Sequence, residues 1–165
     1  MQAMASRFLP KDLDLSRPLA VIAGRGRYPA LLAESARAQG LPVRLLAFRE
    51  EADPALVASF PAAERREIEV GKLGDLLNSL RELGAGAAVM AGQVAPRKLF
   101  SGMVPDLRLV ALLARLPERN AETIFGAVAA EIEASGVRMV DARACLDDHL
   151  ATDGRMTGWL GGFDE

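Results

Sequence analysis

Two short glycine-containing turns carry the residues of this sequence best suited to hold a phosphate group. The first turn consists of Gly24, Arg25 and Gly26, and it follows the apolar run 19–23. Glycines at such a turn let the backbone approach a ligand closely, and a helix that begins just after it attracts anions with its free N–H groups. We therefore predict a phosphate-binding turn here. A lone glycine-rich turn is a weak signal, because tight packing of a helix over a strand produces the same pattern.

The second turn consists of Gly92, Gln93 and Val94, and it follows the apolar run 87–91. If the two runs are neighbouring parallel strands, both turns face the crevice where ligands bind in open α/β sheets. Lys98 follows and offers a cation for an anionic group, although an ordinary surface lysine explains it equally well. The predicted substrate- or nucleotide-binding residues are Gly24, Arg25, Gly26, Gly92, Gln93, Val94 and Lys98.

The elements that position these turns alternate between strands and helices along the chain. Short apolar or alternating runs predict strands, at 19–23, 43–48, 65–70, 87–91 and 137–140. Stripes of apolar residues with helical spacing, together with capping signals, predict helices, at 29–40, 54–60, 73–83, 107–113 and 120–135. This order predicts a three-layer, Rossmann-like α/β sandwich with about five mostly parallel strands. The strands at 19–23 and 87–91 are expected to flank the point where the strand order reverses.

The length of the chain, 165 residues, suits one domain with a substantial core. We expect a lead-in at 1–17 that is ordered only in part, because prolines and charged residues interrupt any regular pattern there. The Rossmann-like domain then covers 18–151. Residues 152–165 are expected to form a tail or the start of an interdomain linker.

Composition excludes several classes of protein. The net charge is −2 and 5% of residues are aromatic, which argues against a nucleic-acid partner. Cys145 and His149 are the single cysteine and histidine, so the chain has no internal disulfide and no Cys/His zinc cluster. No secretory signal or membrane span is recognisable. We expect a cytoplasmic protein with at most peripheral contact with the inner membrane.

Three other chemistries fit the sequence less well. A dinucleotide site would use Gly24, Gly26 and an acidic residue after the second strand, Glu50 or Glu51, but its third glycine is replaced by Pro29. A P-loop fails because no Gly-Lys-Ser/Thr follows at the required spacing. A nucleophilic triad would need His149 as its base, and a solvated surface histidine is the simpler explanation for that residue.

An apolar group lies in what should be a loop between the fourth strand and the next helix. It contains Leu99, Phe100, Met103 and Val104. These side chains would suit an acyl chain or a partner domain. They would equally suit a loop that folds back onto the core.

The same residues make the sequence resemble a known family, the LpxI-type UDP-2,3-diacylglucosamine pyrophosphatases of lipid A biosynthesis. The resemblance covers residues 19 to about 157. It depends on five short motifs in the family's order and spacing, which lie here at 22–29, 52–54, 70–74, 90–94 and 105–106. Two positions depart from the family: Arg25 replaces a glycine, and the family's acidic pair is represented by Asn120, Ala121 and Glu122.

The resemblance implies an enzyme that cleaves the pyrophosphate of a lipid-linked UDP-sugar into UMP and a diacylated glucosamine phosphate, with Mg²⁺ or Mn²⁺ as cofactor. It also implies that this chain is the N-terminal, substrate-binding half, and that the metal-holding residue belongs to a second domain, so the catalytic residues stay unassigned. We expect a fragment, a short relative or a chain with a separate partner half, and exposed apolar surface would favour a homo-oligomer. The alternative is a non-catalytic nucleotide-binding or assembly module with the same fold.

Overall fold

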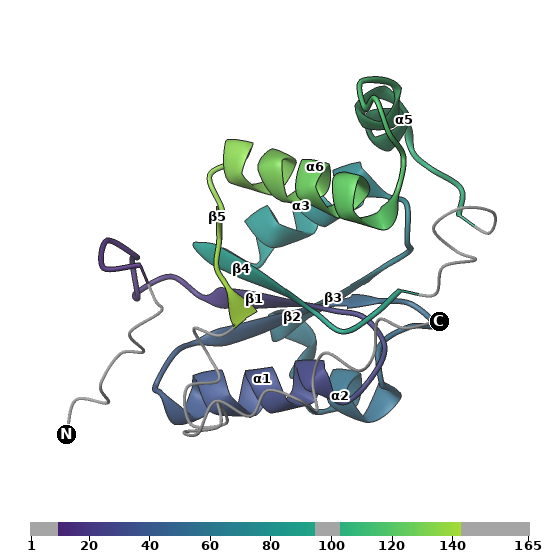
Figure 1. Ribbon diagram of the computed structural model, residues 1–165. Helices are drawn as coiled ribbons and strands as arrows, with labels where there is room; N and C mark the ends of the chain where they lie inside the picture. Colours follow the sequence, from purple (N-terminus) through teal and green to yellow (C-terminus); the bar gives the residue numbers. More distant parts are fainter. Residues whose placement is uncertain (1–9, 95–102, 143–165) are drawn as a thin grey trace, which may run out of the picture.

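The computed structural model describes residues 10–94 and 103–142, and a parallel sheet lies at their centre (Figure 1). The strand order is β3-β2-β1-β4-β5, and every neighbouring pair is parallel. The strands are β1 (Leu19–Ala23), β2 (Val43–Phe48), β3 (Arg65–Ile68), β4 (Ala87–Ala91) and β5 (Arg138–Met139). The sequence-based prediction of a five-stranded, Rossmann-like sheet is confirmed.

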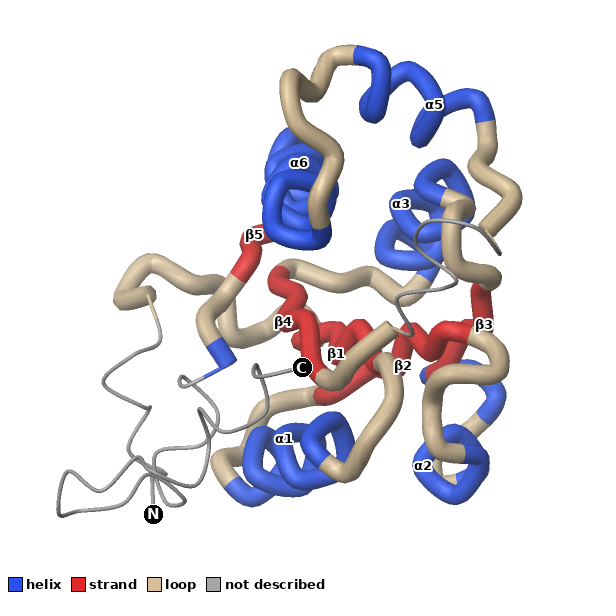
Figure 2. Tube along the Cα trace, turned by 45° about the vertical axis from the view of Figure 1, so that its right-hand side comes forward, coloured by secondary structure: helices blue, strands red, loops and turns tan. Residues whose placement is uncertain are grey.

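Helices cover both faces of this sheet, which gives the predicted three layers (Figures 1 and 2). One face carries α1 (Tyr28–Ala38) and α2 (Pro54–Ala58). The other face carries α3 (Leu73–Glu82) and α6 (Ala121–Ala134), and α5 (Leu107–Ala114) lies further out on that side. A short 3₁₀ helix, η1 (Ala62–Glu64), precedes β3.

Local sequence signals set the ends of several helices. Pro29 lies in the first turn of α1, where its missing N–H costs nothing, and Gly40 follows the helix at φ 81°, a backbone conformation that favours glycine. The Asp53 side chain caps α2 by accepting a hydrogen bond from the backbone N–H of Ala55. Asn120 and Thr123 form a reciprocal capping box at the start of α6.

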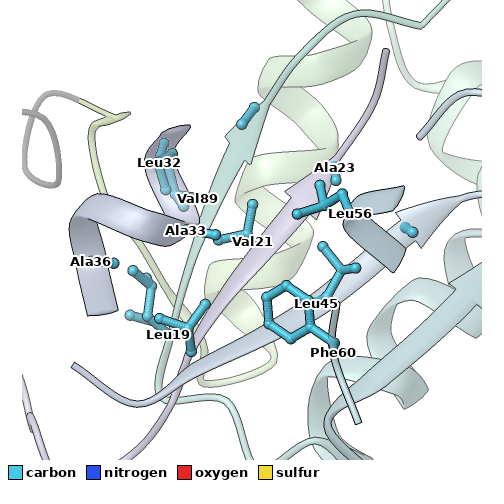
Figure 3. Packing of buried hydrophobic residues seen from close by; sticks show 14 of the residues in the cluster. Leu19, Val21, Ala23, Leu32, Ala33, Ala36, Leu45, Leu56, Phe60 and Val89 are labelled. Carbon is cyan, nitrogen blue, oxygen red and sulfur yellow. The ribbon is translucent and has the colours of Figure 1, made fainter. Parts of the chain in front are cut away.

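The core lies on both faces of the central strand. Every residue of β1 is buried, as expected for a parallel strand covered on both sides. Because successive side chains of a strand point to opposite faces, Leu19, Val21 and Ala23 pack with α1 and α2, as Figure 3 shows. Ala20 and Ile22 pack with α3, α5 and α6 on the other side.

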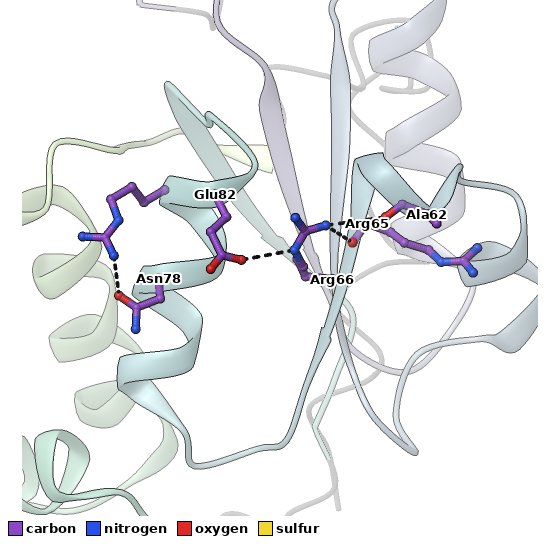
Figure 4. Close-up of polar contacts among 6 residues, drawn as sticks. Ala62, Arg65, Arg66, Asn78 and Glu82 are labelled. Atoms are coloured by element: carbon purple, nitrogen blue, oxygen red, sulfur yellow. Dashed lines mark hydrogen bonds and ion pairs between the residues drawn. The ribbon is translucent and has the colours of Figure 1, made fainter.

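Arg66 ties the edge strand β3 to the helical layer beside it (Figure 4). Its Nε lies 3.3 Å from Oε2 of Glu82 on α3, and its Nη1 donates to the carbonyl oxygen of Arg65 at 2.7 Å. A charged, anchored edge strand is a poor template for pairing with another chain. These features suit β3 to its place at the edge of the sheet.

Residues 10–17 contact the domain by polar interactions. Arg138 Nη1 donates to Asp12 Oδ2 at 2.6 Å, and Arg17 Nη2 donates to the carbonyl oxygen of Ala85 at 2.9 Å. The predicted domain boundary at residue 151 lies outside the described residues. Among the residues that are described, no helix has the length and apolar character needed to cross a membrane.

Candidate functional site

The strand order reverses between β1 and β4, as predicted. The two strands pair in register, with Ala23 beside Ala91 at their carboxyl ends, and the chain then leaves β1 toward one face of the sheet and β4 toward the other (Figure 2). Ligands of open α/β sheets bind just beyond this edge. Both predicted turns, 24–26 and 92–94, lie here.

The two turns are bonded to each other through their backbones. Arg25 donates its N–H to the carbonyl oxygen of Gln93 at 2.6 Å, and Gln93 donates its N–H to the carbonyl oxygen of Arg25 at 3.0 Å. The structure thus extends the β1–β4 contact by one antiparallel bridge, although the two strands themselves run parallel. We call this pair of hydrogen bonds the Arg25–Gln93 bridge.

The bridge explains two of the predicted glycines. A Cβ added to Gly24 would lie 2.5 Å from the carbonyl oxygen of Gln93, and one added to Gly92 would lie 2.7 Å from that of Arg25. Gly92 also has φ 87°, which disfavours other residues. Close approach of the two turns therefore requires glycine at both positions. Gly26, at φ 105°, has no atom within 4 Å of an added Cβ, so open space lies next to it.

Two hollows lie next to the bridge, and Phe48 lines both of them. The polar hollow has a volume of about 640 Å³ and is lined by residues 25–27, by the end of β2 with the segment and helix α2 that follow it, and by β3. The apolar cavity has a volume of about 90 Å³ and is lined by Gly24, Gly92 and Val94 together with side chains of the β1–β4 sheet and of α3, α5 and α6. The predicted site residues are therefore divided between the two hollows.

Arg25 is a cation of the polar hollow that is paired with a buried carboxylate. Its Nε lies 3.3 Å from Oε2 of Glu51, and the side chain of Glu51 is fully buried while that of Arg25 is 58% exposed. Because the buried carboxylate of Glu51 holds one edge of the guanidinium, the remaining N–H donors of Arg25 are left for a ligand. They can bind a planar anionic group. The polar hollow thus offers a positioned anion-binding side chain.

Three further arginines line the polar hollow, Arg27, Arg49 and Arg65. Arg27 is exposed at the N-cap position of α1, and no side chain caps that helix. Arg49 is exposed and lies 3.8 Å from Glu69. Cations and a helix N-terminus at one edge both favour a bound anion. The sequence-based site omitted these residues because nothing in the sequence distinguishes them from ordinary surface arginines.

Glu51 occupies the place after β2 where a dinucleotide-binding protein holds its ribose-binding acid. Its side chain is fully buried and paired with Arg25, so it faces the arginine and not a ribose in solvent. This pairing and Pro29 in the first turn of α1 both argue against a dinucleotide site.

The remaining predicted residues have separate places. Gln93 is exposed and joins the bridge through its backbone, and Lys98 lies outside the described residues. Of the apolar loop group, Met103 packs against the core and lines the apolar cavity, whereas Val104 is 70% exposed. Leu99 and Phe100 lie outside the described residues.

Four acidic residues line the polar hollow, namely Glu50, Glu51, Asp53 and Glu67, but the described residues include no metal-binding set. Within 10–94 and 103–142, no group of three His, Cys, Asp or Glu side chains is placed to hold a metal ion. These residues therefore do not fit a resident Mg²⁺ or Mn²⁺. The roles assigned below to the described residues are binding roles.

The strand order, the layers and the hollow at the switch point define a Rossmann-like α/β domain. Comparison with known families identifies it further: the LpxI N-terminal domain matches residues 18–149. The chain belongs to the LpxI family.

One known relative is similar to this chain over most of the chain's length. It is 29% identical over 143 residues to the UDP-2,3-diacylglucosamine pyrophosphatase LpxI of Caulobacter vibrioides, a match that covers 85% of this chain and 49% of the relative. The chain thus spans about half the length of that relative. Among solved structures, an NAD-bound D-isomer specific 2-hydroxyacid dehydrogenase from Lactobacillus delbrueckii ssp. bulgaricus shares 13% identity over 86% of this chain and 56% of its own, with a TM-score of 0.23. That likeness is too low to support an argument.

Proposed function

We propose that this chain is the substrate-binding half of a UDP-2,3-diacylglucosamine pyrophosphatase and holds the phosphates of its lipid-linked UDP-sugar in the polar hollow. The observation that carries the proposal is the anchored arginine at the switch point: the guanidinium of Arg25 is backed by the buried carboxylate of Glu51. Arg27 and the N-terminus of α1 line the same hollow. Membership of the LpxI family supports the choice of substrate.

In this proposal the described residues bind and orient the substrate. Charge-assisted hydrogen bonds from Arg25 and Arg27 would fix the pyrophosphate oxygens, and Gly26 leaves room for the phosphate beside the backbone. A divalent cation, Mg²⁺ or Mn²⁺, would neutralise charge that develops at phosphorus during water attack, with ligands from a second domain or a partner chain. We place the protein in the cytoplasm, with peripheral contact with the inner membrane where its lipid substrate lies.

Charge reversal in the polar hollow tests this assignment. UMP binding to the full chain is measured by calorimetry for Arg25→Glu and Arg27→Glu, and Arg119→Glu provides a matched reversal at an exposed position outside the hollow. Each hollow variant should bind about tenfold more weakly or worse, since a charge-assisted contact becomes a repulsion. Arg27→Glu is the safer of the two for folding, because an acid is favourable at a helix N-terminus. If a folded Arg27→Glu protein bound UMP with unchanged affinity, the polar hollow would not be the phosphate-binding site.

Hydrolysis assays separate binding from catalysis. UDP-diacylglucosamine is incubated with the chain and Mg²⁺ or Mn²⁺, and UMP release is followed. Binding of UDP-diacylglucosamine without release of UMP supports a substrate-binding half that needs further residues for catalysis. Release of UMP by this chain alone would contradict the proposal that its residues only bind the substrate.

A further inference from the structure

We propose that the outer face of helix α5 binds the surface of an anionic membrane. This face is a feature of the structure that the phosphate site does not use. The choice of a lipid surface over another anionic surface rests on the proposed function, because a lipid-linked sugar reaches the protein from a membrane. The proposed function leaves open which part of the chain makes that contact.

Helix α5 is apolar on both of its sides. Its inner side buries Leu109 and Leu112 against the domain. Its outer side carries four exposed residues with the spacing i, i+3, i+4, i+7 of a single helix face, namely Leu107, Val110, Ala111 and Ala114. We call these four residues the α5 face. Leu107 is 88% exposed and Val110 is 47% exposed, and a continuous apolar stripe of this kind marks a surface for interaction.

Two arginines border the α5 face along one edge. Arg108 and Arg115 lie two helical turns apart, and both are exposed. Among the residues that the structure describes, no ion pair joins Arg108 to a partner, whereas Arg115 Nη2 lies 3.0 Å from Glu131 Oε1 on α6. The segment 107–117 contains these two arginines and no acidic residue. Apolar side chains next to basic ones are typical of helices that bind anionic lipid surfaces.

The charges of this surface argue against a second copy of the chain as the partner. A twofold interface brings the same surface of both copies together, so a positive group needs a negative group within the same surface. Segment 107–117 supplies no such group, and like charges brought together oppose association. Anionic head groups would instead attract Arg108, while Leu107 and Val110 enter the boundary between head groups and acyl chains.

The α5 face lies at the same edge of the sheet as the switch point. Figure 1 shows α5 outermost on its side of the domain. On the inner side of the same helix, Leu109 lines the apolar cavity together with Gly24 and Gly92 of the two turns. A membrane in contact with the α5 face would therefore be about one helix diameter, roughly 10 Å, from this cavity. Binding through this face would bring the carboxyl edge of the sheet close to the lipid surface.

Vesicle binding tests the proposal directly. The full chain is mixed with vesicles of phosphatidylcholine and phosphatidylglycerol in equal parts, or with vesicles of pure phosphatidylcholine, and the bound fraction is measured after centrifugation. The chain should bind the anionic vesicles about tenfold more tightly than the neutral ones, and added salt should reduce this preference. No binding to the anionic vesicles, or equal binding to both kinds, overturns the proposal.

Variants with an added acid assign the binding to the α5 face. Leu107→Asp removes the most exposed apolar side chain of the face at the first position of α5, where an acid is favourable for folding. It should weaken binding to anionic vesicles about tenfold or more. Leu31→Asp is the matched control, because Leu31 is 45% exposed on α1, on the opposite side of the sheet. Equal loss in both variants, or no loss in Leu107→Asp, overturns the assignment.

The role of charge is tested at Arg108. Arg108→Gln should weaken binding to anionic vesicles about fivefold, since a basic residue near an anionic membrane contributes about 1 kcal/mol, and should leave binding to neutral vesicles unchanged. Arg81→Gln, at an exposed position of α3, should behave like the unaltered chain. Equal loss of binding in the two variants would overturn the role of Arg108.

Light scattering without lipid tests the alternative partner. A dimer that Leu107→Asp converts to a monomer, in a chain that does not bind vesicles, would assign the α5 face to a second copy and overturn the proposal. A monomer that binds anionic vesicles through Leu107 supports it.

The same proteins separate this proposal from the proposed function. UMP binding should be unchanged in Leu107→Asp, and vesicle binding should be unchanged in Arg27→Glu. Vesicle binding that depends on Leu107, in a chain that fails to bind UMP, would retain the α5 face and reject the phosphate site. UMP binding that depends on Arg27, without binding to vesicles, would retain the phosphate site and reject the α5 face.

Discussion

The carboxylate of Asp106 accepts a hydrogen bond from the backbone N–H of Gly74 at 2.7 Å. Its other oxygen accepts from the N–H of Leu109 at 2.9 Å. One side chain therefore caps α5 and satisfies an N–H in the first turn of α3, two helices that the sequence separates widely. A Cβ on Gly74 would lie 3.2 Å from that carboxylate, so a small residue is favoured there.

We expect Asp106→Ala to lower the free energy of unfolding by about 1–3 kcal/mol, since it removes an N-cap and leaves a second backbone donor unsatisfied. Asp106→Asn retains one acceptor oxygen and should lose roughly half as much. Urea denaturation measures both. Asp75→Asn, in the exposed first turn of α3, is the control and should change stability by about 0.5 kcal/mol or less. Equal stability of Asp106→Ala and the unaltered chain would contradict the double cap.

The glycines of the two turns give a second prediction, because their role is contact between turns. Gly24→Ala and Gly92→Ala should each destabilise the fold by about 2 kcal/mol or more, as the new Cβ meets a backbone oxygen that cannot move without breaking the bridge. Gly126→Ala is the matched control within α6, where an added Cβ meets nothing within 4 Å. It should stabilise the chain by roughly 0.5–1 kcal/mol. Thermal unfolding followed by circular dichroism shows whether each substitution lowers or raises stability.

Local signals predicted the fold well, and long-range contacts explain what they missed. Pro29 and Asp53 act within one turn of the chain, so their helix starts were visible in the sequence. The parallel sheet and the pair of strands that flanks its reversal followed from alternating strands and helices, which leave few arrangements of such a sheet. The bridge between Arg25 and Gln93 was not visible, and the glycines at 24 and 92 were therefore interpreted as room for a ligand.

We predicted the site as a single crevice at the carboxyl ends of the strands, where the structure brings the two turns together. The structure divides it because the bridge lies between Arg25 and the cavity-lining Val94. Glu51 was considered as a ribose ligand and is instead the partner of Arg25. A carboxylate after a strand is equally compatible with both roles in the sequence, and only the burial of its side chain distinguishes them.

The ion pair between Asp12 and Arg138 predicts a pH dependence. The hydrogen bond from Arg138 is the main reason that the pKa of Asp12 lies below its usual range. A lowered pKa in the folded state contributes stability above the unfolded value of about 3.9, and this contribution is lost as the pH falls through the folded pKa.

Asp12→Asn should therefore be less stable than the unaltered chain near neutral pH, and the difference should shrink as the pH falls below about 4. The effect should be small and should weaken in salt, since the pair is exposed. Urea denaturation at several pH values measures it. Asp14→Asn is not a neutral control, because the Ser16 hydrogen bonds also lower the pKa of Asp14. Lys11→Met is the better control, and a difference that grows on acidification would contradict the ion pair.

Glu51 provides the last prediction, because it acts on a ligand through Arg25. If Glu51 positions the guanidinium, Glu51→Gln should weaken UMP binding about fivefold, equivalent to roughly 1 kcal/mol, even though it removes a negative charge near the phosphates. If Glu51 acted only through its charge, its removal would strengthen UMP binding. Tighter binding of UMP by Glu51→Gln would therefore contradict the positioning role. In an Arg25→Ala background, Glu51→Gln should have no further effect on affinity. Calorimetry measures UMP affinity for the unaltered chain, for Glu51→Gln, for Arg25→Ala and for the double variant. Thermal unfolding followed by circular dichroism confirms that each variant is folded.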